Sequence, residues 1–344
     1  MALRCVYTDL DGTLLGPRGS LFRDANGNFS LNQARALEAC DRANVEVVVM
    51  SGRRESTVLS DSRLMGQTSY IYEAGCAMVI DDEKTYLTGD WVPGDEGTPV
   101  ERFIAAGIPD LLIGEFEGNL ESHSPWHTGR ELSLLMRGRA DVARANELIA
   151  EAGHTDLRFL DNGVLSYRMT GLDGPTHAYH LVPGGASKAK AVDAHRRARG
   201  YELAQCIAIG DSLEDLETAA SVGRFFAVAN GPSGDEAIRE GLPRFDNVTI
   251  TEGSMGDGFY EAVVQTLVAG WSRRGAAAGP RARRSSESVS FGAIPAIPSR
   301  RTEPGTWSSR RRSATAEMIS AATRSGEIAS SALRQSGSRS RSWA

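Results

Sequence analysis

The feature that most constrains the fold is a repeated order of strand and helix in the first 72 residues. Residues 45–50 are nearly all apolar, residues 3–10 have the pattern of a buried strand and residues 69–72 that of a third, short strand, with helix-like stretches between them. Strands that are apolar on both faces belong in a parallel sheet covered by helices on both sides. Right-handed strand–helix–strand units build such a sheet. We therefore expect a Rossmann-like, doubly wound α/β core.

The alternation is interrupted between residues 77 and 183. Residues 77–80 and 84–88 have the pattern of a hairpin, residues 140–152 that of an amphipathic helix, and Asp161-Asn162-Gly163 that of a hairpin turn. These elements follow α+β rules, so we expect residues 77–183 to form an inserted α+β domain. The strand–helix order resumes near Ser187, and residues 1–76 and 184–271 would together form the core domain.

Residues 272–344 differ in composition from the rest of the chain. They contain 14 Arg, no Lys, four Glu and no Asp, a net charge of +10, although the whole chain carries −6. The first 271 residues therefore carry −16, which argues against nucleic acid as a partner of the folded part. A segment rich in Arg, Ser, Ala, Gly and Pro buries too little apolar surface to order itself, so we expect a disordered basic tail. It could attach to nucleic acid or a membrane surface, or be a non-functional extension.

The sequence also limits the compartment and the redox chemistry. No apolar run approaches the roughly 20 residues that span a bilayer, and the N-terminus lacks a signal-peptide pattern. We therefore expect a cytoplasmic protein without a membrane partner. The four cysteines, at positions 5, 40, 76 and 206, form no CxxC pair, so we expect buried thiols rather than a zinc or redox site.

Two carboxylates follow the first expected strand, at the sheet edge where α/β proteins place their sites. Asp9 and Asp11 are two residues apart, so on an extended chain both side chains would point the same way. Such a pair could hold a hard cation and leave one oxygen free to attack phosphorus. The alternative is an ordinary Asp-Gly turn at the end of a strand.

Ser51, Gly52 and Lys188 are candidates for binding phosphate. A hydroxyl and open backbone N–H groups at the start of a helix suit phosphate oxygens, although Ser-Gly is also a common turn. The chain has only three Lys, at positions 84, 188 and 190, against 35 Arg. A lysine kept at the start of a core helix could therefore serve as a compact charge, and Lys190 is the competing candidate.

A further acidic motif, Gly210-Asp211-Ser212-Leu213-Glu214-Asp215, follows a strand of the second half. Asp211 and Asp215 are four residues apart and would lie on one side of the first helical turn. Such carboxylates suit Mg²⁺, which is held by a few carboxylates and keeps several waters. The alternative is an acidic first turn that the helix dipole favours.

Together these residues resemble the motifs of the haloacid dehalogenase superfamily: DxDGT, then Ser, then Lys, then GDSxxD. The resemblance covers about residues 3–270, and the place of the insertion resembles the larger α+β (C2-type) cap of Cof-like sugar-phosphate and phosphoglycolate phosphatases. It implies that Asp9 is the nucleophile and a magnesium ligand, and that Asp11 is the general acid and base with its carbonyl on the metal. It also implies metal-site roles for Asp211 and Asp215, and phosphate contacts from Gly12, Ser51, Gly52 and Lys188.

What the resemblance implies is a Mg²⁺-dependent phosphatase that hydrolyses a small phosphorylated metabolite through an aspartyl-phosphate intermediate. A phosphomutase of the same superfamily and a non-catalytic phosphate-binding protein are the alternatives. Cof-like proteins often have Asn before the Gly that follows the third strand, where this chain has Glu73-Ala74-Gly75, and Asn before the last Asp of the fourth motif, where this chain has Glu214. The first departure puts any transfer of substrate preference in doubt.

Other polar side chains of the insertion have a weaker pattern. Three have spacing that could suit a metal, although their Ser/Pro/Gly-rich surroundings favour a surface loop: Glu121, His123 and His127. Three arginines could meet an anionic substrate or lie on a solvated face: Arg130, Arg137 and Arg168.

Overall fold

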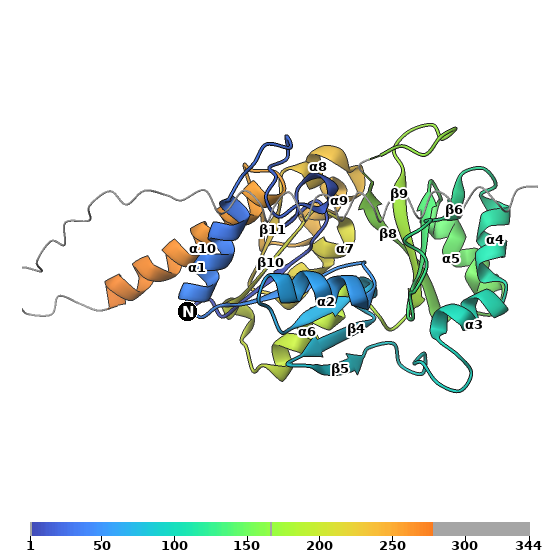
Figure 1. Ribbon diagram of the computed structural model, residues 1–344, viewed down its shortest axis with the longest axis horizontal. Helices are drawn as coiled ribbons and strands as arrows, with labels where there is room; N and C mark the ends of the chain where they lie inside the picture. The colour runs from blue at the N-terminus through green and yellow to red at the C-terminus, as the bar shows by residue number, and fades with distance from the viewer. Residues whose placement is uncertain (1, 166, 278–344) are drawn as a thin grey trace, which may run out of the picture. The chain divides into compact units, whose positions relative to one another are not determined.

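A computed structural model describes residues 2–165 and 167–277, with side chains up to residue 269 (Figure 1). From position 278 onwards, the basic tail expected at residues 272–344 lies outside the described residues. Among the helices that are described, none is long and apolar enough to cross a bilayer. The last of them, α10 (Gly256–Ala277), continues past residue 271, the expected end of the core domain.

The larger sheet is the parallel sheet that the strand–helix alternation predicts. Its order is β12-β11-β10-β1-β2-β3-β4-β5, and the first six strands in this order are parallel. Those six are β12 (Val248–Ile250), β11 (Arg224–Ala227), β10 (Cys206–Gly210), β1 (Cys5–Thr8), β2 (Glu46–Met50) and β3 (Tyr70–Tyr72). Since β1 lies between β2 and β10, the chain reverses its winding direction at β1, as in a doubly wound fold.

Helices cover both faces of this sheet, because its central strands are apolar on both sides. One face packs against α1 (Asn32–Arg42), α2 (Glu55–Leu64) and α10, through residues such as Ala36, Val58 and Phe259. The other packs against α6 (Lys188–Ala198), α7 (Leu213–Leu216) and α9 (Glu236–Gly241), through residues such as Val192 and Leu216. A short helix, α8 (Asn230–Gly234), follows β11.

The hairpin β4 (Ala77–Ile80) and β5 (Glu83–Tyr86) belongs to the larger sheet. It pairs antiparallel with β3, so Ala77 lies opposite Tyr72 and the hairpin extends the edge. The sequence analysis placed this hairpin at the start of the insertion, and that placement is wrong. Its buried residues Ala77 and Val79 pack with those of the parallel strands, which is why it adds to this sheet.

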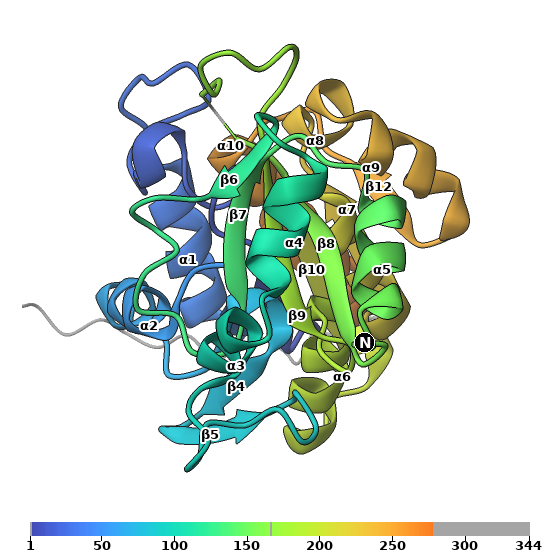
Figure 2. The same cartoon turned by 90° about the vertical axis from the view of Figure 1, so that its right-hand side faces the viewer.

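The second sheet is antiparallel, in the order β6-β7-β9-β8. It comprises β6 (Leu120–Ser122), β7 (Leu134–Gly138), β8 (Leu157–Val164) and β9 (His177–Pro183). Figure 2 shows three helices lying over one of its faces: α3 (Pro99–Ala105), α4 (Ile108–Glu115) and α5 (Val142–Glu151). Leu160 and Val182, on the other face, belong to the apolar cluster of the larger sheet. We call β6–β9 with α3–α5 the cap layer.

Asp161-Asn162-Gly163 is a bulge inside β8 rather than a hairpin turn. The strand continues to Val164, which pairs with His177, and the register shifts between Asp161 and Val164. The expected turn is therefore wrong, because its residues extend an existing pairing with β9. A bulge re-aims side chains, and here it lies beside α7, which begins in the acidic motif.

Candidate active site

Strand register brings the expected motifs to one edge of the larger sheet. Thr8 at the end of β1 pairs with Val49 of β2 and with Ile209 of β10. Asp9, Ser51 and Asp211 therefore leave three adjacent parallel strands at the same edge. This is the carboxyl edge, where open α/β sheets place their ligands.

Lys188 joins two of the carboxylates. Its ammonium donates to Oδ1 of Asp9 at 2.8 Å and to Oδ1 of Asp215 at 2.7 Å. Lys188 is the first residue of α6, and Ser187 is the N-cap of that helix. The side chain of Lys188 is almost completely buried. Lys190, the competing candidate, is exposed on the next part of the same turn.

The segment that follows β10 carries Asp211 and Asp215. Asp215 Oδ2 accepts from the hydroxyl of Ser212, which in turn accepts from the Asp215 N–H, so the two residues form a capping box. Asp211 accepts from Thr13 Oγ1 at 2.9 Å and from Asn230 Nδ2 at 3.2 Å. A Cβ on Gly12 would lie only 2.3 Å from Asp211 Oδ2, so only glycine lets the first loop pass this carboxylate.

The charges of this cluster fit a divalent cation. Carboxylate oxygens of Asp9, Asp211 and Asp215 all lie within 4.8 Å of one another. Three carboxylates and the single ammonium of Lys188 leave two negative charges in a buried space. Burial raises the pKa of Asp9 to about 7 despite the opposing effect of Lys188, and burial with the neighbouring carboxylates raises that of Asp211 well above its usual range. Hard oxygen donors at this spacing could hold Mg²⁺.

Asp11 does not join this cluster. Arg53 donates to both carboxylate oxygens of Asp11, at 2.7 and 2.6 Å, and the Asp11 side chain is 58% exposed. The extended backbone on which Asp9 and Asp11 would point the same way does not continue to Asp11, because β1 ends at Thr8 and the chain turns immediately. The N–H groups of Thr13 and Leu14 donate to Leu10 and Asp9 in that turn.

Ser51 and Gly52 lie between β2 and α2, as expected for a phosphate loop. Ser51 is buried, and its hydroxyl accepts from the N–H of Arg53 at 3.2 Å. Gly52 is approached by the cap layer, since a Cβ built on it would lie 2.7 Å from Nε2 of His180. A side chain at this position would therefore collide with the second sheet.

Glu73 and Arg130 connect the two sheets, and sequence reasoning assigned neither this role. The buried carboxylate of Glu73 accepts from the N–H groups of Glu131, Leu132 and Ser133. The guanidinium of Arg130 is also buried and donates to the carbonyl of Gly52 at 2.6 Å. Glu73 belongs to the segment Glu73-Ala74-Gly75, in which the chain departs from the family pattern, but that departure does not indicate a junction with the second sheet.

The remaining candidates of the insertion do not meet in a site. His123 is buried and contacts the hydroxyl of Tyr167 at 2.7 Å, so the expectation of a surface loop is wrong for it. Glu121 pairs with Arg137, and Arg168 is exposed. Thr13 and Asn230, which hold Asp211, were also missed: both lie in segments that read as ordinary turns.

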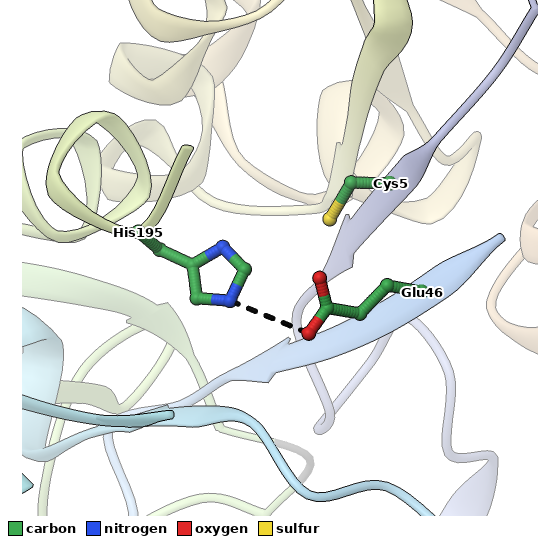
Figure 3. Close-up of side chains that lie close together, drawn as sticks. All are labelled: Cys5, Glu46 and His195. Atoms are coloured by element: carbon green, nitrogen blue, oxygen red, sulfur yellow. Dashed lines mark ion pairs between the residues drawn. The ribbon is translucent and has the colours of Figure 1, made fainter. Parts of the chain in front are cut away.

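A second group of possible ligands lies at the opposite edge of the larger sheet (Figure 3). Atoms of Cys5, Glu46 and His195 lie within 4.8 Å of one another. The Glu46 carboxylate, however, already accepts from Arg199 at 2.9 Å and from Tyr201 at 3.0 Å. This group therefore works as a hydrogen-bonded junction between strand starts. All four cysteines are free and buried, as expected.

Known proteins that are similar to this chain belong to one family. Residues 163–237 match the family described as haloacid dehalogenase-like hydrolase. The chain is 33% identical to a phosphoglycolate phosphatase of Halobacterium salinarum over 74% of this chain and 93% of that protein. It is 28% identical to the corresponding protein of Halorubrum lacusprofundi, over 67% of this chain and 86% of that one.

Among solved structures, the sucrose-phosphatase of Synechocystis, in complex with sucrose and phosphate, has a similar fold. The TM-score is 0.55 at 15% identity, covering 77% of this chain and 98% of that one. This likeness concerns the fold alone: a Rossmann-like core with a cap. The chain therefore belongs to the haloacid dehalogenase-like hydrolases, and it is a phosphatase.

Proposed function

We propose that the chain is a Mg²⁺-dependent phosphatase that hydrolyses a small phosphomonoester through an aspartyl-phosphate on Asp9. The observation that carries the proposal is the way Lys188 holds the Asp9 carboxylate. Lys188 bonds to Oδ1, and in the described part of the chain no hydrogen bond engages Oδ2. One oxygen is thus fixed, and the other is free to attack.

Each chemical step has a residue that could perform it. Oδ2 of Asp9 would attack phosphorus, and the bond from phosphorus to the leaving oxygen would break while Asp11 protonates that oxygen. Asp11 would then take a proton from water, whose oxygen attacks the same phosphorus and releases phosphate from Asp9. To reach the leaving oxygen and the water, the Asp11 carboxylate would have to break its ion pair with Arg53.

The metal would be held mainly by Asp9 and Asp211, with the backbone carbonyl of Asp11. Asp215 would support them, since its oxygens already serve Lys188 and the Ser212 turn. When bound, Mg²⁺ would offset the repulsion between the carboxylate nucleophile and the phosphate dianion. Ser51 and the N–H groups of the following loop would contact the phosphate oxygens.

Isosteric variants separate the two carboxylates of the first motif. In Asp9→Asn we expect neither turnover nor a phosphoenzyme in rapid-quench experiments with a labelled aryl phosphate. In Asp11→Asn we expect turnover to fall by about 10²–10⁴-fold, while phosphoenzyme still forms from this good leaving group. Asp193→Asn, on α6 and paired with Arg196, is the matched control and should keep wild-type turnover.

Two results would overturn the proposal. One is near-normal turnover by Asp9→Asn. The other is equal turnover by the wild type with Mg²⁺ and with excess chelator, after correct folding has been checked by circular dichroism.

A further inference from the structure

Two polar side chains of the cap layer lie directly over Gly52. A Cβ built on Gly52 would be 2.7 Å from Nε2 of His180 and 3.0 Å from Nδ2 of Asn162. His180 is on β9, and Asn162 is in the bulge of the neighbouring strand β8. The next residue, Gly163, would place a Cβ 3.4 Å from that of Ser212. The pair therefore spans the two loops that would hold phosphate and metal, where the rest of a phosphate ester must extend.

The neighbours of His180 determine what its imidazole offers. Nη2 of Arg130 has two N–H groups and three possible acceptors. The carbonyl of Gly52 at 2.6 Å and Ser133 Oγ at 2.7 Å take both hydrogens, because Nδ1 of His180 is farther away, at 3.4 Å. Ser133 gives its own hydroxyl hydrogen to the Glu73 carboxylate, a charged acceptor that outcompetes a neutral one. Nδ1 of His180 lies 3.3 Å from Ser133 Oγ, and what remains for it is to donate to that oxygen.

Nε2 of His180 is then left as a hydrogen-bond acceptor that faces the space over Gly52. Burial, with the charges of Arg130 and Lys188, lowers the pKa of His180 well below its usual range, so the imidazole is neutral. A neutral acceptor attracts a hydroxyl group and repels a carboxylate.

Asn162 provides a second unmet hydrogen-bonding group at this place. Its Oδ1 is buried and has no hydrogen-bond partner within the described residues. A buried polar atom without a partner is costly, so such an atom beside the phosphate loop is a candidate to bind a ligand. An amide offers one acceptor and one donor, and a hydroxyl group can satisfy either.

The buried cations beside these two residues already have partners. Lys188 bonds to Asp9 and Asp215, and Arg130 bonds to Gly52 and Ser133. Neither has a charge to spare for a carboxylate on the leaving group. Two arginines follow the phosphate loop: Arg53 pairs with Asp11 and Asp61, and Arg54 donates to the carbonyl of Thr128 at 2.8 Å. A carboxylate substrate would have to recruit one of these two cations.

We propose that His180 and Asn162 form the leaving-group site, and that it selects a hydroxyl-bearing group, such as a sugar or polyol, over a carboxylate-bearing one, such as glycolate. This inference rests on the proposed phosphatase function. It differs from what the names of the archaeal relatives would suggest, because those names specify phosphoglycolate.

The test compares kcat/KM of the purified full chain with Mg²⁺ for sugar and polyol phosphates, 2-phosphoglycolate and phenyl phosphate. We expect the wild type to favour at least one sugar or polyol phosphate over phosphoglycolate by about tenfold or more. In His180→Ala, the ratio of that substrate to phenyl phosphate should fall about tenfold, mainly through KM.

His177→Ala is the matched control. It removes an imidazole from the same strand, but His177 pairs with Asp161 and does not approach Gly52, so the ratio should be unchanged. If His180→Ala does not fold, Asn162→Ala carries the same expectation. Preference for phosphoglycolate that is lost in Arg54→Ala would overturn the inference, as would an unchanged ratio in a folded His180→Ala.

The two levels of proposal can fail separately. If the wild type with Mg²⁺ hydrolyses none of these phosphate esters, the proposed function fails. Calorimetric affinities of the same sugar phosphates and of phosphoglycolate then decide the leaving-group site without turnover: tighter binding of the hydroxyl-bearing compounds supports it, and tighter binding of phosphoglycolate overturns it.

Discussion

Lys188 is the residue on which the charge balance of the site depends. It is the one cation bonded directly to Asp9 and Asp215 among the described residues, and it is fully buried with them. Burial alone would lower its pKa, but the two carboxylates outweigh burial and raise it. The ammonium therefore stays charged and both stabilises and positions the nucleophile.

Replacing this cation should cost far more stability than replacing its neighbour. In Lys188→Met we expect the free energy of unfolding to fall by about 3–5 kcal/mol, because two buried carboxylates lose their counter-charge. Lys190→Met, an exposed change on the same turn, should stay within about 0.5 kcal/mol of wild type. Urea denaturation in the presence of a chelator measures both. Equal losses in the two variants would contradict this account.

At the residue scale, sequence reasoning works where a role depends on local spacing. Asp9, Asp211 and Asp215 meet because each follows a strand or opens a helix, and their neighbours set that geometry. The direction of the Asp11 side chain depends on a turn and on Arg53, 42 residues away. The partners of Glu73 come from 58 to 60 residues further along the chain, so its role could not be predicted from local pattern.

At the element scale, hydrogen bonds to Glu46 connect the start of β2 with the residue before β3 and with the residues that follow α6. Glu46 opens β2 and accepts from Ser69 before β3, and from Arg199 and Tyr201 after α6. His195 lies 3.6 Å from the same carboxylate (Figure 3). Burial opposes its ionisation, but the hydrogen bond and charge of His195, with Ser69 and Arg199, lower the pKa of Glu46 to about 2.

This junction should weaken in acid. The folded pKa lies below the usual 4.5, so the stabilisation is complete above pH 4.5 and is lost as the pH falls through about 2. We expect the difference in unfolding free energy between wild type and Glu46→Gln to shrink by about 3 kcal/mol between pH 6 and pH 2. Glu83→Gln, on the exposed edge strand, should show no such trend. A constant difference across this range in denaturant titrations would sink the argument.

The cap layer depends on the Glu73 junction. Glu73→Ala would leave three N–H groups and the hydroxyl of Ser133 without their acceptor, and the buried Arg130 guanidinium without the carboxylate 3.9 Å away. We expect a loss of about 3–5 kcal/mol, as for other buried charges that lose a partner. Glu83→Ala should be near neutral, since that residue is exposed on β5. Thermal or urea unfolding that shows similar stability for both variants would rule out this role.

Element order was predictable from the sequence, but membership in a sheet was not. The apolar runs and helix periods fix the parallel strands because both faces must be buried. The hairpin at β4 and β5 has the same period-two pattern in either sheet, so only its contacts with β3 decide where it joins. The bulge in β8 carries a composition that also suits a tight turn, and pairing with β9 decides between them.

At the scale of the whole molecule, the candidate active site is largely buried beneath the cap layer in the part of the chain that the structure describes. Asp9, Ser51 and Lys188 are 6%, 2% and 1% exposed, and the cap layer contacts Gly52. We expect that a phosphate ester can reach Oδ2 of Asp9 only if these contacts open. The cap layer must therefore move away from the larger sheet during each cycle, as lids do in many enzymes.

A reversible cross-link tests this movement. A Cβ on Gly163 would lie 3.4 Å from the Cβ of Ser212, close to the spacing of about 3.8 Å in disulfides, so Gly163→Cys with Ser212→Cys should form one. We expect the oxidised double variant to lose turnover by about tenfold or more, because substrate cannot enter, and to regain it with dithiothreitol. Comparing the two redox states of one protein removes the cost of the substitutions themselves, including the strain at Gly163, whose φ is 98°.

The natural cysteines are buried, and each single variant should be insensitive to the reductant. Full turnover in a double variant whose disulfide is complete by mass spectrometry would mean that substrate reaches Asp9 without opening of the cap layer.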